Sequence, residues 1–322
     1  MRVAVIGGAG YIGSHVALAL ADAGHTPVVF DNLRTGKREH LSFEHEFIEG
    51  DIRSRDDLEA LFSKEIDTVV HLAALKSVSA SMREPHAYSD VNVTGTIRLL
   101  EAMQRAGVHR IVFSSSAAVY GTPRELPLTE EHPLAPESYY GQTKAWVEEM
   151  LAWHTRTSGL RSVSLRYFNA VGSDERITVR EPEPENLFPI LLETAAGERG
   201  SITIYGDDYD TPDGTCLRDY VDVRDLAEAH VRAIEHLKAH EGSSVYNLGT
   251  GKGLSVRECV DATSRLFGNF TVNIGERRAG DPSSSYADVS LVRRELGWTA
   301  RITDVEEMLA SMARAYGLEV RR

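Results

Sequence analysis

Cysteine is scarce in this sequence of 322 residues, which contains only Cys216 and Cys259. Two cysteines cannot build a disulfide framework or a cysteine-rich metal site, so we expect no metal centre and a reducing, cytoplasmic location. Long hydrophobic runs are also absent, since no stretch approaches the roughly 18 consecutive apolar residues of a membrane span. The sequence therefore predicts a protein that does not cross a membrane.

Basic residues are in deficit. The chain has 35 Lys and Arg against 48 Asp and Glu, a formal net charge of −13. This balance argues against nucleic acid or an anionic membrane surface as the main partner, but it leaves room for a local basic pocket that binds phosphate groups. The length predicts one large domain or two smaller ones.

Short apolar runs alternate with helical patterns through the first half of the chain. We expect strands near residues 3–6, 28–31, 47–51, 68–72, 111–114 and 162–168, and helices near 12–23, 55–62, 91–106 and 141–153. Apolar strands that alternate with helices are typical of a parallel sheet covered on both faces. Right-handed crossovers then predict an α/β fold with a doubly wound parallel (Rossmann) sheet.

This alternation stops after Asn169. Residues 173–186 are rich in proline and acidic residues without periodicity, which predicts a connection or lid. Helices are expected near 187–196, 225–237, 256–267 and 305–316, and strands near 202–205 and 245–248. We therefore expect a cofactor-binding domain over residues 1–169, rejoined by about 221–249, and a smaller α/β substrate-binding domain over 170–220 and 250–322.

A glycine-rich turn follows the first predicted strand. Gly7, Gly10 and Gly13, within GGAGYIG, have the spacing of a dinucleotide-binding loop and lead into the first predicted helix. Glycine lets the backbone approach a pyrophosphate, and the helix start supplies amide donors. Asp31 ends the second strand, where its carboxylate would bond the adenosine ribose and repel a 2′-phosphate. These features predict NAD rather than NADP, and Arg34 is the one neighbour that weakens the preference.

Two further strand ends carry candidate cofactor contacts. Asp51 follows the third strand, where its carboxylate would reach the adenine amino group or serve as an ordinary turn residue. Leu72, Ala73 and Ala74 follow the fourth strand, and their small side chains would let backbone approach the cofactor. His71 has no second ligand at metal spacing, so we interpret it as structural.

A serine run and a tyrosine–lysine pair lie where doubly wound sheets bind ligands. Ser114 to Ser116 follow the fifth strand, and Tyr140 and Lys144 are one turn apart on the next helix. A neighbouring ammonium and the positive nicotinamide would lower the pKa of a tyrosine from about 10 and stabilise its phenolate. Tyr140 could then remove a hydroxyl proton, with Ser116 bonded to the reacting oxygen. Tyr139 points about 100° away on a helix, so Tyr140 is the expected base.

These segments together resemble the UDP-galactose 4-epimerase family of the extended short-chain dehydrogenase/reductase superfamily. The resemblance rests on GGAGYIGSH, HLAALKSVSAS, FSSSAAVYG, YYGQTK and RYFNAVG, and it continues through IYGDDYDTPDGTCLRDYVDV, YNLGTG and RRAGD over essentially the whole chain. It implies reversible inversion at C4 of a UDP-hexose through a 4-keto intermediate, with tightly bound NAD. Ile6 departs from the threonine of many members, a change we expect to be harmless.

The resemblance implies specific contacts for each ligand. For catalysis it implies Tyr140, Lys144 and Ser116. For the cofactor it implies Gly7, Gly10, Tyr11, Ile12, Gly13, Asp31, Asn32, Leu33, Arg34, Thr35, Gly36, Asp51, Ile52, Leu72, Ala73, Ala74, Lys76, Asn92, Ser114, Tyr140, Lys144 and Phe168. For the UDP-sugar it implies Lys76, Ser116, Tyr140, Asn169, Asn186, Leu187, Thr203, Ile204, Tyr205, Arg218, Arg278, Asp281 and Ser285. Among these, Tyr205 would pack on uracil, and Arg218 and Arg278 would hold the diphosphate.

Ser285 carries an implication for sugar specificity. In the family, the fourth residue after the aspartate of the RRAGD motif borders the pocket beside C2 of the sugar. A tyrosine there confines the enzyme to plain hexoses, whereas a small residue admits N-acetylated sugars. Counting from Asp281 gives Ser285, which implies interconversion of UDP-glucose and UDP-galactose together with activity on N-acetylated UDP-sugars. A shift of one residue would place Tyr286 at this position, and that alternative stays open.

Rival functions are a nucleotide-sugar 4,6-dehydratase, a decarboxylase of UDP-glucuronate and a non-catalytic NAD sensor. Dehydratases of this type carry Asp-Glu after the active-site serine or threonine, whereas Ser116 is followed by Ala117 and Ala118. The decarboxylase is disfavoured for a similar reason. A sensor has no use for Ser116, Tyr140 and Lys144 together.

The family resemblance also implies a homodimer. Its interface would be a four-helix bundle built from the helices near 91–106 and 141–153 of each subunit. Leu99, Leu100 and Met103 on the first of these helices are either contacts between subunits or core residues that face the sheet.

Overall fold

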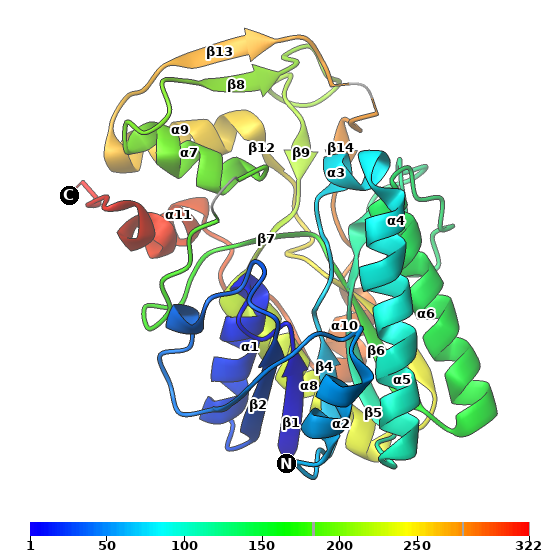
Figure 1. Ribbon diagram of the computed structural model, residues 1–322. Helices are drawn as coiled ribbons and strands as arrows, with labels where there is room; N and C mark the ends of the chain where they lie inside the picture. The colour runs from blue at the N-terminus through cyan, green and yellow to red at the C-terminus, as the bar shows by residue number, and fades with distance from the viewer. Residues whose placement is uncertain (182–183, 279, 322) are drawn as a thin grey trace.

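A seven-stranded parallel sheet forms the frame of the computed structural model, which describes residues 1–181, 184–278 and 280–321 (Figure 1). Pro182 and Glu183 of the predicted connection, Ala279 of the RRAGD motif and Arg322 lie outside the described residues. The strand order is β11-β6-β5-β4-β1-β2-β3. In that order the strands are Ser243–Leu248, Arg161–Tyr167, Arg110–Ser116, Thr68–His71, Arg2–Ile6, Thr26–Asp31 and Glu46–Glu49. The predicted doubly wound α/β fold is confirmed, and its order reverses between β1 and β4.

Helices cover both faces of this sheet (Figure 1). On one face lie α1 (Tyr11–Asp22) and α8 (Val223–Ala239), and on the other lie α2 (Arg55–Phe62), α5 (Gly95–Arg105) and α6 (Tyr139–Ser158). Successive side chains of a strand point to opposite faces. Val3 and Val5 of β1 therefore pack in the core beneath α1 and α8, and Ala4 and Ile6 pack in the core beneath α2, α5 and α6.

The long helix α6 carries the predicted tyrosine and lysine. The side chain of Ser138 caps its start by accepting a hydrogen bond of 3.0 Å from the amide of Gly141. Gly159 ends the helix in the left-handed conformation, with φ of 69°. These local signals place the first turn of α6 at the carboxyl end of β5.

A second group of elements lies beyond the carboxyl ends of the strands (Figure 1). Its helices are α7 (Leu187–Ala195), α9 (Val256–Phe267) and α11 (Val305–Ala313), which share a core that includes Phe188, Cys259 and Met308. Two small sheets accompany them. These are β8 (Ile202–Tyr205) with β13 (Val272–Gly275), and β9 (Leu217–Arg218) with β12 (Leu254–Ser255) and β14 (Ser284–Ser285). One more pair, β7 (Asn169–Val171) with β10 (Tyr220–Asp222), runs between the two groups.

Some elements depart from the sequence predictions. The expected helix over 91–106 is preceded by α3 (Val78–Arg83) and α4 (Pro85–Tyr88), and begins with a π-helical turn, η2 (Ser89–Thr94). Further elements that were not predicted are the strand β13, the helix α10 (Ser290–Leu296) and three 3-10 turns. These turns are η1 (Arg38–His40), η3 (Ala117–Val119) and η4 (Arg314–Tyr316).

Leu99, Leu100 and Met103 lie in the core of the sheet. Each is at most 2% exposed, and all three lie on α5 and pack in the core between this helix and the sheet. The interpretation of these residues as core is confirmed, and their interpretation as contacts between subunits is wrong. A dimer that used α5 must use its other face.

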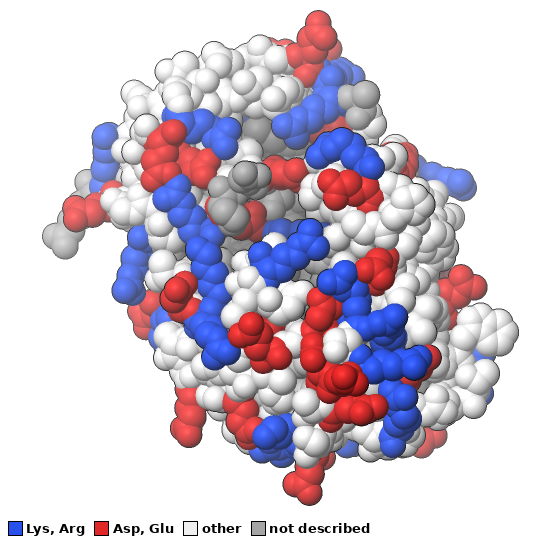
Figure 2. All heavy atoms as spheres, in the orientation of Figure 1, with Lys and Arg blue, Asp and Glu red and all other residues white. Residues whose placement is uncertain are grey.

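The surface carries both basic and acidic side chains, as expected for a chain with 35 Lys and Arg and 48 Asp and Glu. On the face drawn in Figure 2, basic and acidic side chains are interspersed. Among the described residues, no helix combines the length and the apolar character that crossing a bilayer requires. The same residues contain no cluster of three or more His, Cys, Asp or Glu suited to a metal ion.

Candidate active site

The glycine turn between β1 and α1 has space for backbone only. A Cβ atom on Gly7, whose φ is +80°, would lie 2.7 Å from the amide nitrogen of Ala73. A Cβ atom on Gly13 would lie 2.1 Å from the carbonyl oxygen of Gly7. The helix start at Gly10 has no side-chain cap, so its first amides remain available to a ligand. This cradle has the shape and the amide donors that a pyrophosphate needs, and the contacts of the three glycines, Tyr11 and Ile12 with a cofactor stay predictions.

Asp31 connects the glycine turn to the loop after β2. Its carboxylate accepts hydrogen bonds from the amides of Ala9 at 3.0 Å and Leu33 at 2.8 Å. Gly36 lies against the same turn, because a Cβ atom there would meet the carbonyl of Ala9 at about 2.9 Å. Asn32, Arg34 and Thr35 lie between these contacts. Hydrogen bonds thus connect the glycine turn to the loop that is predicted to bind the ribose and adenine.

Asp51 has partners within the chain. It accepts hydrogen bonds from the Arg53 guanidinium at 2.9 and 2.8 Å and from Asn32 Nδ2 at 2.9 Å. The Arg53 guanidinium holds the pKa of this carboxyl well below its usual range. Ile52 beside it is 5% exposed and contacts Gly95. The structure brings Asn32 and Asp51 together as an adenine site would require, and the contact with adenine stays a prediction.

Three other predicted cofactor contacts have partners within the protein. The Lys76 ammonium pairs with Glu181 across the space between the loop after β4 and the connection 173–186. The buried Asn92 carboxamide bonds the amide and carbonyl of Leu75 at 2.8 and 3.0 Å. Phe168 is 8% exposed and packs with Tyr120 and Leu128. Their contacts with a cofactor therefore stay predictions.

Ser116, Tyr140 and Lys144 converge at the carboxyl end of β5. The Ser116 side chain lies close enough to the Tyr140 hydroxyl to act on the pKa of that hydroxyl. The Lys144 ammonium donates to the carbonyl of Ser114 at 2.7 Å and lies 5.7 Å from the centre of the Tyr140 ring. Tyr139 points elsewhere, because its hydroxyl bonds Ser89 at 2.6 Å. The three predicted catalytic side chains are thus brought together, while Tyr139 is kept apart.

The pKa values of this cluster differ from the expectation. Burial raises the pKa of Tyr140 to about 12, although the nearby Ser116 hydroxyl acts in the opposite direction. Burial likewise lowers the pKa of Lys144 to about 7, and the nearby Glu148 carboxylate partly offsets this. The expected lowering of the tyrosine pKa is therefore not produced by Lys144 in the chain alone. A further positive charge beside the phenol is needed to make it a base near neutral pH.

The predicted diphosphate contacts lie in the small sheet opposite. Arg218 of β9 forms an ion pair with Asp281, and its guanidinium is 16% exposed. Ser285 of β14 pairs in register with Arg218, so the structure brings these three predicted residues together. Tyr286 lies beyond the strand, where its ring is 3.4 Å from a Cβ atom built on Gly253.

The remaining predicted substrate residues are distributed around this sheet. Arg278 lies with its guanidinium carbon 4.0 Å from the centre of the exposed Tyr205 ring. Asn186 begins α7 without a side-chain cap, and Asn169 donates its side-chain amide to the carbonyl of Asp219 at 2.9 Å. Leu187 and Thr203 are half-buried, whereas Ile204 is buried in the core of the second group. The side chain of Ile204 therefore supports the site from behind.

Sequence reasoning missed several buried charged residues that organise the site. Asp219 is fully buried and accepts hydrogen bonds from the amides of Thr250, Gly251 and Ala287 at 2.7 to 3.1 Å. It therefore fixes the YNLGTG loop against the segment after Ser285. Glu148 and Arg166 form a second buried group behind Lys144. Asp219 could have been found from the sequence, because it lies in the motif LRDYVDV. Glu148 and Arg166 lie in no recognisable motif.

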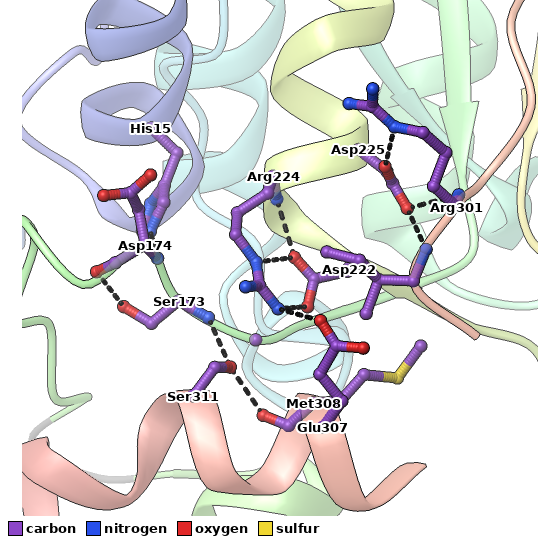
Figure 3. Close-up of polar contacts among 12 residues, drawn as sticks. His15, Ser173, Asp174, Asp222, Arg224, Asp225, Arg301, Glu307, Met308 and Ser311 are labelled. Carbon is purple, nitrogen blue, oxygen red and sulfur yellow. Dashed lines mark hydrogen bonds and ion pairs between the residues drawn. The ribbon is translucent and has the colours of Figure 1, made fainter. Parts of the chain in front are cut away.

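The junction between the two groups of elements is polar (Figure 3). His15 of α1 accepts a hydrogen bond of 3.0 Å from the amide of Asp174, and burial lowers its pKa to about 4, so the ring is neutral. Arg224 donates to the buried Asp222 at 2.8 and 2.9 Å and also pairs with Glu307 of α11. Helix α1 and helix α11 are thus both connected to the segments around β7 and β10.

Comparison with known proteins agrees with this geometry. Residues 3–249 match the NAD dependent epimerase/dehydratase family. A UDP-glucose 4-epimerase from Lacticaseibacillus casei is 44% identical over 96% of this chain and 95% of its own. The crystal structure of UDP-glucose 4-epimerase from Brucella ovis in complex with NAD has a TM-score of 0.96 at 44% identity, covering 99% of both chains. The Bifidobacterium longum UDP-glucose 4-epimerase in complex with NAD+ and UDP has a TM-score of 0.92 at 39% identity, covering 98% of both chains. The resemblance found in the motifs is confirmed, and the chain belongs to the NAD dependent epimerase/dehydratase family.

Proposed function

We propose that this protein is an NAD-dependent UDP-glucose 4-epimerase, which interconverts UDP-galactose and UDP-glucose. The observation that carries the proposal is the convergence of Ser116, Tyr140 and Lys144 beside a glycine turn that fits a pyrophosphate. The similarity to UDP-glucose 4-epimerases extends over both groups of elements, so it includes the segments proposed to bind the sugar nucleotide.

Each proposed catalytic residue has a distinct task. Bound NAD supplies a reversible hydride acceptor and a positive charge near Tyr140. Tyr140 removes the proton of the sugar 4-hydroxyl, and Ser116 holds that oxygen by a hydrogen bond. The Lys144 ammonium, which is held by its hydrogen bond to the Ser114 carbonyl, stabilises the Tyr140 phenolate by its positive charge. Inversion at C4 requires that the oxidised sugar turn in the pocket, so that the bound cofactor would return the hydride to the opposite face of C4, and Tyr140 would then give the proton back to the C4 oxygen.

The sugar nucleotide lies between two units in this proposal. Residues 1–169, with 221–249, form the NAD-binding unit, and residues 170–220 with 250–322 form the unit that binds UDP. Arg218 is suited to the diphosphate because a planar guanidinium can bond two phosphate oxygens at once. Its present partner Asp281 would then move to the uridine ribose.

Incubation of the purified protein with UDP-galactose tests the function. The expected result is formation of UDP-glucose without added NAD, together with a small absorbance of reduced nicotinamide from the protein-bound cofactor. A 4-keto-6-deoxy product would instead indicate a dehydratase. An absorbance change without turnover of the sugar would indicate a sensor.

Ser285 is proposed to determine sugar specificity. Residues paired in register on neighbouring strands point to the same face, so Ser285 and Arg218 share the face assigned to the substrate. The serine leaves space for an acetamido group beside the sugar. We therefore expect the wild-type protein to convert UDP-N-acetylglucosamine as well as UDP-galactose.

Replacing Ser285 by tyrosine should close that space. We expect Ser285→Tyr to lose about tenfold or more in kcat/KM for UDP-N-acetylglucosamine and to keep turnover of UDP-galactose. Ser285→Ala is the matched control, since it stays small and should retain both activities. Equal loss on both sugars, or a wild type that ignores the N-acetylated sugar, contradicts this role.

A homodimer is proposed through the outer faces of α5 and α6, which run side by side (Figure 1). Ile97 of α5 and Trp146 and Trp153 of α6 are 42%, 38% and 55% exposed. Large apolar side chains gathered on neighbouring helices are typical of an interface between subunits.

A charge on this face should separate the subunits. We expect the wild type to have the mass of a dimer by light scattering at micromolar concentration, and Trp153→Glu to shift it toward the monomer. Ile274→Glu on β13, another exposed apolar position at 50%, is the control and should remain dimeric. A wild-type monomer would remove the dimer from the proposal.

A further inference from the structure

A buried ion pair lies behind the proposed catalytic lysine. The Arg166 guanidinium donates to both carboxylate oxygens of Glu148, at 3.0 and 2.6 Å, and both side chains are at most 7% exposed. The Ser115 hydroxyl donates to the same carboxylate. Because desolvation offsets much of the attraction in such a pair, stability alone is a weak reason for it. A role in positioning the neighbouring catalytic residues is a stronger reason.

The pair fixes α6 to the sheet. Ser115 of β5 and Arg166 of β6 are paired in register, and both donate hydrogen bonds from the sheet to the Glu148 carboxylate. Tyr140, Lys144 and Glu148 are spaced by four residues, so they share the face of α6 toward the sheet. The carboxylate is therefore anchored one turn from the lysine and two turns from the tyrosine.

Arg166 also reaches the segment after the catalytic serine. Its guanidinium donates to the Tyr120 hydroxyl at 2.8 Å, and this hydroxyl donates to Asn247 of β11 at 2.7 Å. Tyr120 directly follows η3, the turn that begins after Ser116. One guanidinium thus connects α6, the turn after the serine and the edge strand of the sheet.

The carboxylate also acts on the charge of Lys144. The lysine is 3% exposed, and Glu148 raises its pKa against the lowering effect of burial. His71 on β4 is neutral, because burial lowers its pKa to about 3. The ionisable groups that surround the tyrosine and lysine come from α4, β4, β6 and α6 itself, and they are Tyr88, His71, Arg166, Tyr167 and Glu148.

The tyrosine and the lysine share one proton balance. Removal of one proton from the pair gives either a phenolate beside an ammonium or a phenol beside a neutral amine. Only the first form is a base for the sugar hydroxyl. A carboxylate closer to the lysine than to the tyrosine favours that form, because it stabilises the ammonium more than it opposes the phenolate.

We propose that Glu148 and Arg166 are positioning residues for the reaction, which hold α6 so that Tyr140 and Lys144 face Ser116, and that the Glu148 carboxylate keeps Lys144 in the ammonium form beside the Tyr140 phenolate. The roles of the tyrosine and lysine in this inference rest on the proposed function. Its test, however, needs no sugar turnover.

The test is a phenolate titration of the NAD-loaded protein without sugar. The ultraviolet phenolate absorbance of wild type and Glu148→Gln is followed from about pH 6 to pH 9, and the signal of Tyr140→Phe is subtracted to isolate Tyr140. We expect Glu148→Gln to keep its NAD and to lose about tenfold in the phenolate fraction at the upper end of this range, the effect of one pKa unit. Its kcat for UDP-galactose should fall in parallel.

Matched variants separate charge from packing. Ser115→Ala removes one hydrogen bond but keeps the carboxylate, and Glu148→Asp keeps the charge, so both should retain most of the phenolate signal. If Glu148→Gln does not fold, the double variant Glu148→Leu with Arg166→Met replaces the pair by apolar groups of similar size, and it should show the same loss.

The inference is overturned if folded Glu148→Gln, or the folded double variant, shows as much Tyr140 phenolate as the wild type. It is also overturned if the wild type shows no Tyr140 phenolate signal below pH 9. A protein that shows the titration but does not convert UDP-galactose contradicts the proposed function instead. The two failures are therefore distinguishable.

Discussion

Tyr140→Phe should reduce kcat for UDP-galactose by at least ~10², because the phenylalanine retains the ring and loses the only group placed to take the 4-hydroxyl proton. The half-buried Tyr140 lies near Ser116, and the Lys144 ammonium lies 5.7 Å from the centre of its ring. The remaining activity would come from binding and from the hydrogen bond of Ser116. Steady-state kinetics with UDP-galactose, together with the NAD content of the purified protein, measures the effect.

Tyr139→Phe is the control for this change. It removes the neighbouring hydroxyl, which bonds Ser89 at 2.6 Å, and it should leave kcat within about twofold of the wild type. Tyr140→Phe should keep its NAD and its melting temperature, since the substitution retains the ring and the helix backbone. Near-normal turnover in Tyr140→Phe, or a large loss in Tyr139→Phe, would remove Tyr140 from the role of base.

The parallel sheet and its covering helices could be predicted because their signals are local. Two helices, Arg55–Phe62 and Val256–Phe267, match the predicted bounds. Each follows a serine whose side chain caps the helix, and Ser255 forms a full capping box with Glu258. Apolar runs such as that of β1 predict burial on both faces without any knowledge of the partners.

Elements held by distant partners could not be predicted in this way. The strand β13 pairs with β8, which lies far back in the sequence, and most of its residues are exposed. The strands β9, β12 and β14 contain two residues each, too few for a periodic pattern. The π-helical turn η2 likewise depends on packing against α4 and α6. In each case tertiary contacts decide the local conformation.

The candidate site divides in a similar manner. Gly13, Ser116 and Tyr140 lie in motifs whose spacing reveals the chemistry. Glu148 and Arg166 do not, because a glutamate on a helix and an arginine on a strand are ordinary surface residues until the register of β5 and β6 is known. The raised pKa of Tyr140 is another property that depends on burial.

Gly13→Ala should abolish the binding of NAD. The added Cβ would lie 2.1 Å from the carbonyl oxygen of Gly7 and 2.7 Å from the Cα of Gly8. Both neighbours are backbone atoms of the glycine turn, so no flexible side chain can move aside. The turn would have to open away from α1, and this displaces the amides that hold the pyrophosphate. The crowding itself should cost about 1–3 kcal/mol of stability, and loss of bound NAD lowers the melting temperature further.

Nucleotide released from the denatured protein and thermal melting with added NAD measure these effects. Gly200→Ala is the matched control, because among the residues that the structure describes no atom lies within 4 Å of its added Cβ, and it should keep NAD and stability. Gly10→Ala distinguishes an effect on the fold from an effect on the ligand. Within the described part of the chain its Cβ meets only the Gly7 carbonyl oxygen, at 3.3 Å, so the turn should survive while the methyl crowds the bound pyrophosphate. We therefore expect Gly10→Ala to lose NAD while its cofactor-free form keeps the wild-type melting temperature. We expect Gly13→Ala to lose NAD and also to have a lower melting temperature in its cofactor-free form. If Gly13→Ala retains its NAD, the turn between β1 and α1 does not hold the dinucleotide, and the cofactor must be sought at another edge of the sheet.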